Sequence, residues 1–304
     1  MEIRSHRFRV VDILLLCGVI LPPVLGMVIK ILTNSPSGGI EISGARIYFT
    51  LDLPFQSLPI TEAQVNSWLV VISIFFLCLY LTHGLAVKAV TKRQLLAEWI
   101  VKTTENMISG NMGDYFIKVA RGAFAPFVAG IMALSAFSSL LSLLGLYAPT
   151  SDINVSAGWA LLVFILITYY KMKCGLPHYL KSFAEPVAFL TPLNVISEVA
   201  TPVSMAFRHY GNILSGSVIS VLVASALQGL SSMLLGWLPG FLGDIPFLQI
   251  GIPAILSLYF DIFGSLLQAF IFAMLTMLYV SGGFAIDDWE LLQAKKKQKL
   301  QTQQ

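Results

Sequence analysis

The stretch LNVISEVATPVSMAFRHYGNILSGSVISVLVASAL, residues 193–227, decides the fold, because it is long and mostly apolar yet carries Arg208 near its centre. A helix of this length measures roughly 50 Å, whereas the hydrocarbon core of a bilayer is ~30 Å thick. The helix must therefore tilt steeply or bend, and Pro202 is a natural position for a bend. Its polar residues recur every three or four positions on one face, with Glu198 beside them. They are Asn194, Ser197, Thr201, Ser204, Arg208, Asn212 and Ser215. Such a face cannot contact lipid, so it must meet water or a protein.

The composition is that of a polytopic membrane protein. Of 304 residues, 56% are hydrophobic and 12% charged, which is about half the charged fraction of a soluble domain. Cys17, Cys78 and Cys174 show no paired spacing, and we interpret them as packing residues. No zinc-protease, nucleophile-elbow or phosphate-loop motif is present. We therefore expect no cofactor, no metal and no nucleic-acid partner.

Six apolar segments predict an all-α fold with six membrane crossings, at residues 10–32, 67–87, 123–146, 155–170, 193–227 and 252–280. The first also resembles a signal peptide, but its length and the lack of a cleavage site favour a retained anchor. Between the spans we expect an exposed loop with β-like alternation (33–66), an amphipathic interfacial segment (94–121) and a loop or re-entrant segment (228–250). The chain divides into an anchor with its external loop (1–66), a membrane domain (67–286) and a solvated basic tail (287–304).

Basic residues are distributed unequally across this topology. Only Lys30 and Arg46 fall on one side, Arg208 lies within the membrane, and the remaining lysines and arginines fall on the side of the two termini. The positive-inside rule makes the crowded side cytoplasmic. Both termini are therefore predicted to be cytoplasmic.

Three ionisable residues remain at membrane depth: Glu198 towards the inner side, Arg208 near the middle and Asp261 towards the outer side. Each costs ~2.5–3.5 kcal/mol at a helix centre, so such residues normally pair or line an ion path. A pair that only locks two helices is one alternative. Their spread over depth favours an ion path, and so does the polar line Ser257, Asp261, Ser265 and Gln268 on the last span.

This order of charges indicates two half-paths that do not meet. Protons can move through acids and trapped water on either side, but Arg208 does not lose its proton at working pH. An ion could cross only on a moving carrier, and a carboxylate on that carrier would release its proton near Arg208. His209 points ~100° away around the helix, so packing or hydrogen bonding is favoured over proton relay for it.

Four segments resemble subunit a of the rotary F-type ATP synthases: PTSDIN (149–154), KMK (171–173), PLNVISEVATPVSMAFRHYGN (192–212) and LLQAFIFAMLTMLY (266–279). The resemblance implies a non-catalytic membrane stator beside a ring of c subunits, whose carboxylates would be the carrier of H⁺ or Na⁺. It also implies peripheral-stalk b subunits and the rest of the complex as partners, in a bacterial plasma membrane. The alternatives are an ion-coupled secondary transporter, which should show inverted repeats, and an intramembrane enzyme, which should show a nucleophile or metal motif.

Through the resemblance, single residues acquire expected roles. Arg208 matches the essential arginine, Asn212 the asparagine of the following Gly-Asn pair, and Gln268 the glutamine opposite. Glu198 matches the acid of the inner path, and Asp261 the position of an outer-path Glu or His.

The sequence departs from the family pattern at three places. His209 and Tyr210 replace the common Leu-Phe, Thr201 replaces a frequent lysine, and Ser217 stands where many relatives have Glu or His. The outer path then depends on Asp261. The secondary polar candidates are His209, Ser204, Ser215, Ser217 and Ser265.

Overall fold

The computed structural model describes residues 10–33, 44–52, 54, 57–85, 91–119, 123–176, 179, 183, 189, 191–235, 255–256 and 258–302. This part of the chain is almost entirely helical, which confirms the all-α membrane fold. It contains six helices that are long and apolar enough to cross a bilayer. They are α1 (Val10–Thr33), α2 (Glu62–Thr82), α5 (Phe124–Leu140, continued by the 3₁₀ turn η1, Leu141–Leu144), α6 (Ile153–Lys173), α8 (Thr191–Leu235) and α11 (Ser265–Gly282).

Several predicted boundaries differ from the observed ones by a few residues, and two differences change how a predicted loop is described. Helix α2 begins at Glu62 instead of residue 67, because the strand before it ends at Thr61 and the Gln64 side chain accepts a hydrogen bond from the Thr61 backbone N–H at 3.2 Å. Helix α8 continues to Leu235, so the first part of the predicted loop 228–250 is helical. Residues 236–250 of that loop lie outside the described residues, as do residues 34–43 of the predicted external loop.

The β-like alternation before α2 forms a hairpin. Strand β1 (Ile47–Asp52) pairs antiparallel with β2 (Ser57–Thr61), and Thr50 lies opposite Pro59. The Glu62 backbone N–H donates to the Arg46 carbonyl at 2.7 Å, which joins the hairpin directly to the start of α2.

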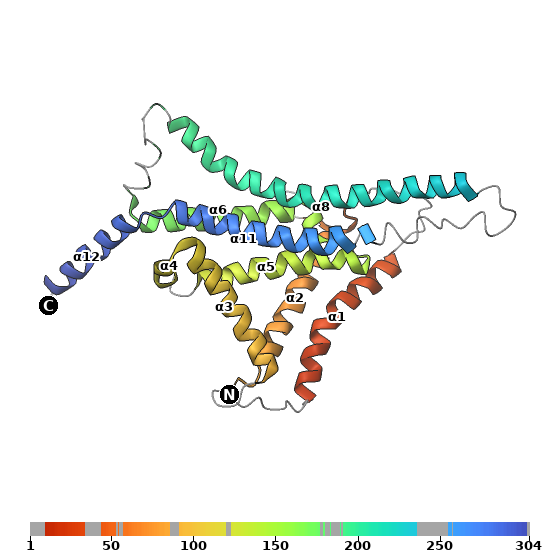
Figure 1. The fold of residues 1–304 in the computed structure, drawn as a ribbon, viewed down its shortest axis with the longest axis horizontal. Helices are drawn as coiled ribbons and strands as arrows, with labels where there is room; N and C mark the ends of the chain where they lie inside the picture. The colour runs from red at the N-terminus through yellow and green to blue at the C-terminus, as the bar shows by residue number, and fades with distance from the viewer. Residues whose placement is uncertain are drawn as a thin grey trace.

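The long helices run side by side. Figure 1 shows α5, α6 and α11 stretched alongside α8, which curves along its length, while α1 and α2 lie at a steep angle to them. Helix α8 contacts α6 and α11, and α5 contacts α11. The bend expected from the length of α8 is therefore present, with Pro202 inside the helix.

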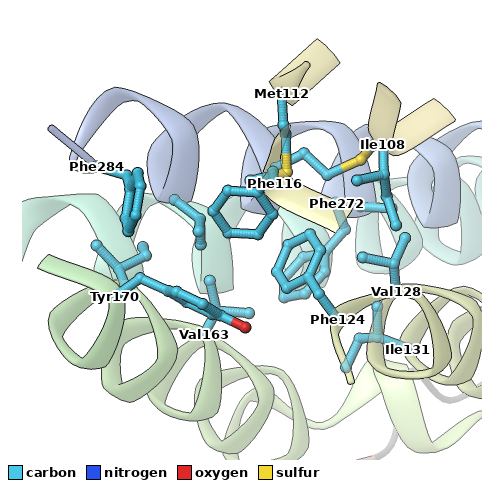
Figure 2. Close-up of a cluster of buried hydrophobic side chains, with 14 of the residues drawn as sticks. Ile108, Met112, Phe116, Phe124, Val128, Ile131, Val163, Tyr170, Phe272 and Phe284 are labelled. Atoms are coloured by element: carbon cyan, nitrogen blue, oxygen red, sulfur yellow. The ribbon is translucent and has the colours of Figure 1, made fainter. Parts of the chain in front are cut away.

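The predicted interfacial segment supplies the core at one end of this bundle. It forms α3 (Lys92–Met112) and α4 (Asp114–Val119), separated by Gly113 with φ +84°, a conformation that favours glycine. Figure 2 shows Phe116 of α4 among Phe124, Tyr170 and Phe284, and the Phe116 and Phe124 ring centroids are 5.1 Å apart. This aromatic cluster fixes the ends of α6 and α11 relative to each other.

Helix α1 is attached by polar and close contacts. The Arg93 guanidinium lies 2.6 Å from the Asp12 carboxylate, and the two side chains are 8% and 0% exposed. The Ser73 hydroxyl of α2 donates to the Val19 carbonyl at 2.7 Å. Gly18 lies against the Phe76 ring, where a Cβ would come within 2.5 Å. These contacts make α1 part of the packed structure.

The predicted basic tail is also helical. Helix α12 (Ile286–Thr302) leaves the bundle after α11 (Figure 1), and its Trp289 packs on Phe284 with ring centroids 6.2 Å apart.

Candidate functional site

Two cavities with several polar lining residues lie at different heights along α8, apart from an apolar one around Pro202. The first, which we call the Glu198 cavity, has a volume of about 400 Å³ and lies where α6 ends and α8 begins. Its polar lining includes Lys171, Asn194, Glu198 and Thr201. The second, the Ser217 cavity, has a volume of about 260 Å³ and lies further along α8. Its polar lining includes Asn212, Ser217 and Ser265 together with Ser139, Ser142, Tyr147 and Ser151. Arg208 lies between these levels on α8 and lines neither cavity.

Arg208 points out of the protein. Its side chain is exposed, together with Ser204, Asn212 and Ser215, as the three- and four-residue spacing predicts. Among the described residues its guanidinium has no hydrogen bond and no ion pair. The exposed face is wider than the polar stripe, because Val203 and Phe207 are 48% and 58% exposed. An unpaired cation on a broad apolar helix face requires a partner outside this chain or water.

His209 faces the opposite way, into the protein. It is 0% exposed, and its Nε2 lies 3.4 Å from the Ser135 hydroxyl of α5. Its ring packs against Trp159 of α6 and Phe272 of α11, with centroids 5.5 and 5.4 Å away. His209 therefore joins α8 to three other helices, and this attachment directs the neighbouring Arg208 outward. The geometry favours the packing interpretation of His209.

This geometry predicts different results for two His209 variants. His209→Leu keeps most of the packing volume and loses one hydrogen bond, worth ~1 kcal/mol. The protein should therefore fold, and the proton transport expected from its sequence should remain within about a factor of two. His209→Asp buries a carboxylate among aromatic rings and should abolish assembly. Membrane content by immunoblot and transport in vesicles measure both results. Loss of transport in a well-assembled His209→Leu variant would support proton relay instead.

Glu198 has a partner that the sequence did not indicate. The Lys171 ammonium at the end of α6 lies 2.8 and 2.9 Å from the two Glu198 carboxylate oxygens. The side chains of Lys171 and Glu198 are 22% and 13% exposed, so the pair contacts the cavity. The expected alternative was an ion pair among the membrane-depth charges themselves. Glu198 instead pairs with Lys171 at the end of α6, and Arg208 has no ion pair with the described residues. The sequence feature that could have indicated this ion pair was Lys171, a cation at the end of a predicted span.

The Ser217 cavity lies where α8 passes close to the start of the last span. A Cβ on Gly216 would lie 3.5 Å from Phe260, and the Asn212 amide donates to the Gly264 carbonyl at 3.4 Å. The Ser217 hydroxyl donates to the Leu214 carbonyl at 2.8 Å. Burial, and secondarily the Asp152 carboxylate, raise the pKa of Tyr147. Its phenol therefore lines the cavity as an uncharged group at physiological pH. Sequence reasoning singled out Ser217 but missed Tyr147 and the α5 serines.

The last span departs from the predicted geometry before Ser265. Residues Tyr259–Gly264 form the π-helical segment η4, and Asp261 belongs to it. A π-helix bonds residue i to i+5 and not i+4, so the four-residue steps predicted to align Asp261 with Ser265 do not hold there. Ser257 lies outside the described residues, and so does the Asp261 side chain. Ser265 and Gln268 of α11 are both buried, and no hydrogen bond joins Gln268 to Arg208.

The family model described as ATP synthase A chain matches residues 64–281, well over half of the sequence. The chain belongs to this family. Relatives named ATP synthase subunit a include those of Priestia megaterium, 32% identical over 74% of this chain and 94% of the relative, and Macrococcus caseolyticus, 31% identical over 82% and 96%. That of Legionella pneumophila (strain Corby) is 29% identical over 74% and 87%.

The match covers nearly all of the chain from α2 to α11, the whole lining of the Ser217 cavity, and that of the Glu198 cavity except residues 282–285. It includes α2 and α3, whereas the resemblance found in the sequence covered roughly residues 123–284. Helix α1 and the β hairpin precede the matched residues. The two long helices that carry the site, α8 and α11, lie wholly or almost wholly within the match.

Proposed function

We propose that this chain moves protons along two separate paths, the Glu198 cavity on the inner side and the Ser217 cavity on the outer side, with Arg208 between them. As a member of the ATP synthase A chain family, it is a non-catalytic, proton-translocating stator subunit of the F1Fo ATP synthase and a multi-pass membrane protein. Family membership does not favour a secondary transporter. The observation that carries the proposal is the position of Arg208, which is exposed on α8, has no ion pair with the described residues, and lies between the levels of the two cavities.

In the proposed cycle, the exposed face of α8 lies against the ring of c subunits. A ring carboxylate takes up a proton from the Ser217 cavity, where Asp261 is the proposed acid, and travels through the lipid in neutral form. It later reaches the Glu198 cavity, loses the proton through Glu198, and passes Arg208 as an anion. Arg208 favours that anion and carries no proton itself. Asn212 and Gln268 would orient the polar groups beside it.

The driving force follows from the separation of the paths. Each elementary charge that crosses a potential of 100 mV contributes ~2.3 kcal/mol. Because neither cavity reaches Arg208, a proton can use this energy only by moving with the ring. The ring and the peripheral-stalk b subunits are therefore the proposed partners, in the plasma membrane of a bacterium.

Crosslinking tests the proposed ring face. Single cysteines at Ser204, Asn212 and Ser215 should form disulfides with cysteines on the outer helix of a c subunit, because these side chains share the exposed face. A cysteine at Ala206 on the buried face is the matched control and should not react. Equal crosslinking from both faces would refute the proposed contact.

Labelling tests the proposed orientation. Because basic residues crowd the side of the termini, a cysteine introduced in α12 should be cytoplasmic, while one in the β1–β2 hairpin should react with a membrane-impermeant maleimide added to intact cells. Reaction of the α12 cysteine from outside intact cells would reverse the orientation.

A further inference from the structure

The Lys171–Glu198 ion pair differs from the other interhelical pair between basic and acidic side chains in the described chain. The Asp12 and Arg93 side chains are buried in their contact, with 0% and 8% of their surface exposed. Lys171 and Glu198 instead contact a cavity of about 400 Å³ and keep 22% and 13% of their side chains exposed. A partly solvated ion pair adds little to stability, so locking α6 to α8 is a weak reason for its presence. Because water in the cavity can solvate both charges, the Lys171–Glu198 ion pair can also dissociate.

The fold holds Lys171 in place from a third helix. The lysine stem crosses Gly283 at the end of α11, where a Cβ would lie 2.5 Å from Lys171 Cε and 2.9 Å from Cγ. The φ of Gly283 is −90°, which any residue can adopt. The glycine is therefore required for space and not for its backbone conformation. Ends of α6, α8 and α11 meet at this one contact.

We propose that Lys171 is a positioning residue of the inner path: it holds Glu198 as a compensated carboxylate in the Glu198 cavity and releases it each time a proton passes. This inference rests on the proposed function. An arriving proton adds to a Glu198 oxygen, and the Lys171 ammonium, now without its counter-ion, turns into the cavity water. The proton then leaves to the inner solution, Glu198 regains its charge, and the pair re-forms. One proton has moved, and both groups have returned to their starting state.

Among the described residues, the other titratable groups that line the cavity are the phenols of Tyr179 and Tyr279. Burial, and secondarily the Glu198 carboxylate, raise the pKa of Tyr179, so this phenol stays neutral in the working range. Among the described groups that line the cavity, Lys171 is thus the cation that faces Glu198. Its long flexible stem suits a contact that must break and re-form, unlike the rigid fork of an arginine.

The experiment measures ATP-driven proton pumping by inverted vesicles that contain the whole complex, as a function of the pH of the medium. Lys171→Gln should assemble normally. Its pumping should decline at an alkaline pH about one unit higher than that of the parent, because a proton that binds Glu198 then displaces no cation. Lys173→Gln is the matched control, since Lys173 lies over the Tyr169 ring, 5.0 Å from its centre. An unchanged profile in assembled Lys171→Gln vesicles would overturn the proposal.

Two further variants separate positioning from locking. Gly283→Ala should displace the Lys171 stem and move the profile in the same direction, whereas Gly158→Ala, where a Cβ meets open space away from the Glu198 cavity, should not. The exchange Lys171→Glu with Glu198→Lys keeps an ion pair between the helices. It should assemble normally but fail to pump, and normal pumping by this variant would show that the pair only locks α6 to α8. If Glu198→Gln and Arg208→Ala also pumped normally, the proposed function itself would fail.

Discussion

Replacing Arg208 with alanine should reduce proton-driven ATP synthesis more than about a hundredfold while the complex still assembles. Arg208 is exposed and its guanidinium has no hydrogen bond or ion pair with the described residues, so its removal should cost the fold little. The variant loses the fixed charge that attracts the ring carboxylate and repels protons between the paths. Arg208→Lys should also fail, because an ammonium lacks the planar fork and can lose its proton when desolvated.

The measurement is ATP synthesis driven by an imposed ΔpH in membrane vesicles, together with passive proton leak through vesicles stripped of the soluble ATPase. Arg208→Ala should raise the leak, since nothing then separates the two paths. Val203→Ala is the matched control, because Val203 is exposed on the same helix face without a charge. Normal synthesis by either arginine variant would remove Arg208 from the mechanism.

Replacing Asp261 with asparagine should lower ATP synthesis at least about a hundredfold, the usual loss when a proton-transfer group is removed. Asparagine keeps the size of the side chain but cannot carry a proton. Asp261→Glu should retain much of the activity. The Ser217 hydroxyl cannot substitute, because a hydroxyl does not titrate in this range and this one already donates to the Leu214 carbonyl.

Moving the acid across the helix contact provides the sharper test. Ser217 lines the cavity and its helix packs on η4 through Gly216 and Phe260, so Ser217→Glu should restore part of the activity in the Asp261→Asn background. Ser217→Glu alone is the control and should leave synthesis close to that of the parent. If Asp261→Asn matches the parent at every pH, the outer path uses another group.

The sequence was sufficient to predict the six spans and the exposed polar face of α8, because both depend on local patterns. Apolar length identifies a span, and the spacing of Ser204, Arg208 and Asn212 identifies a face as long as the helix is a regular α-helix. The same reasoning does not extend to Asp261. Its predicted alignment with Ser265 assumed α-helical geometry, and η4 is π-helical.

Contacts between distant helices could not be predicted in this way. Lys171 and Glu198 are 27 positions apart, and their pairing depends on how α6 and α8 pack and on the space left by Gly283. His209 was correctly expected to turn away from Arg208. Its partners Ser135, Trp159 and Phe272, however, come from three other helices and follow only from the tertiary structure.

The pairing of Asp12 with Arg93 has a consequence for the order in which the chain is built. The two residues are 81 positions apart, so Asp12 leaves the ribosome long before its partner exists. Until then α1 must remain at the membrane with an uncompensated carboxylate near its first turn, a state that its long apolar stretch can sustain. Docking of α1 therefore completes only after α3 has been synthesised.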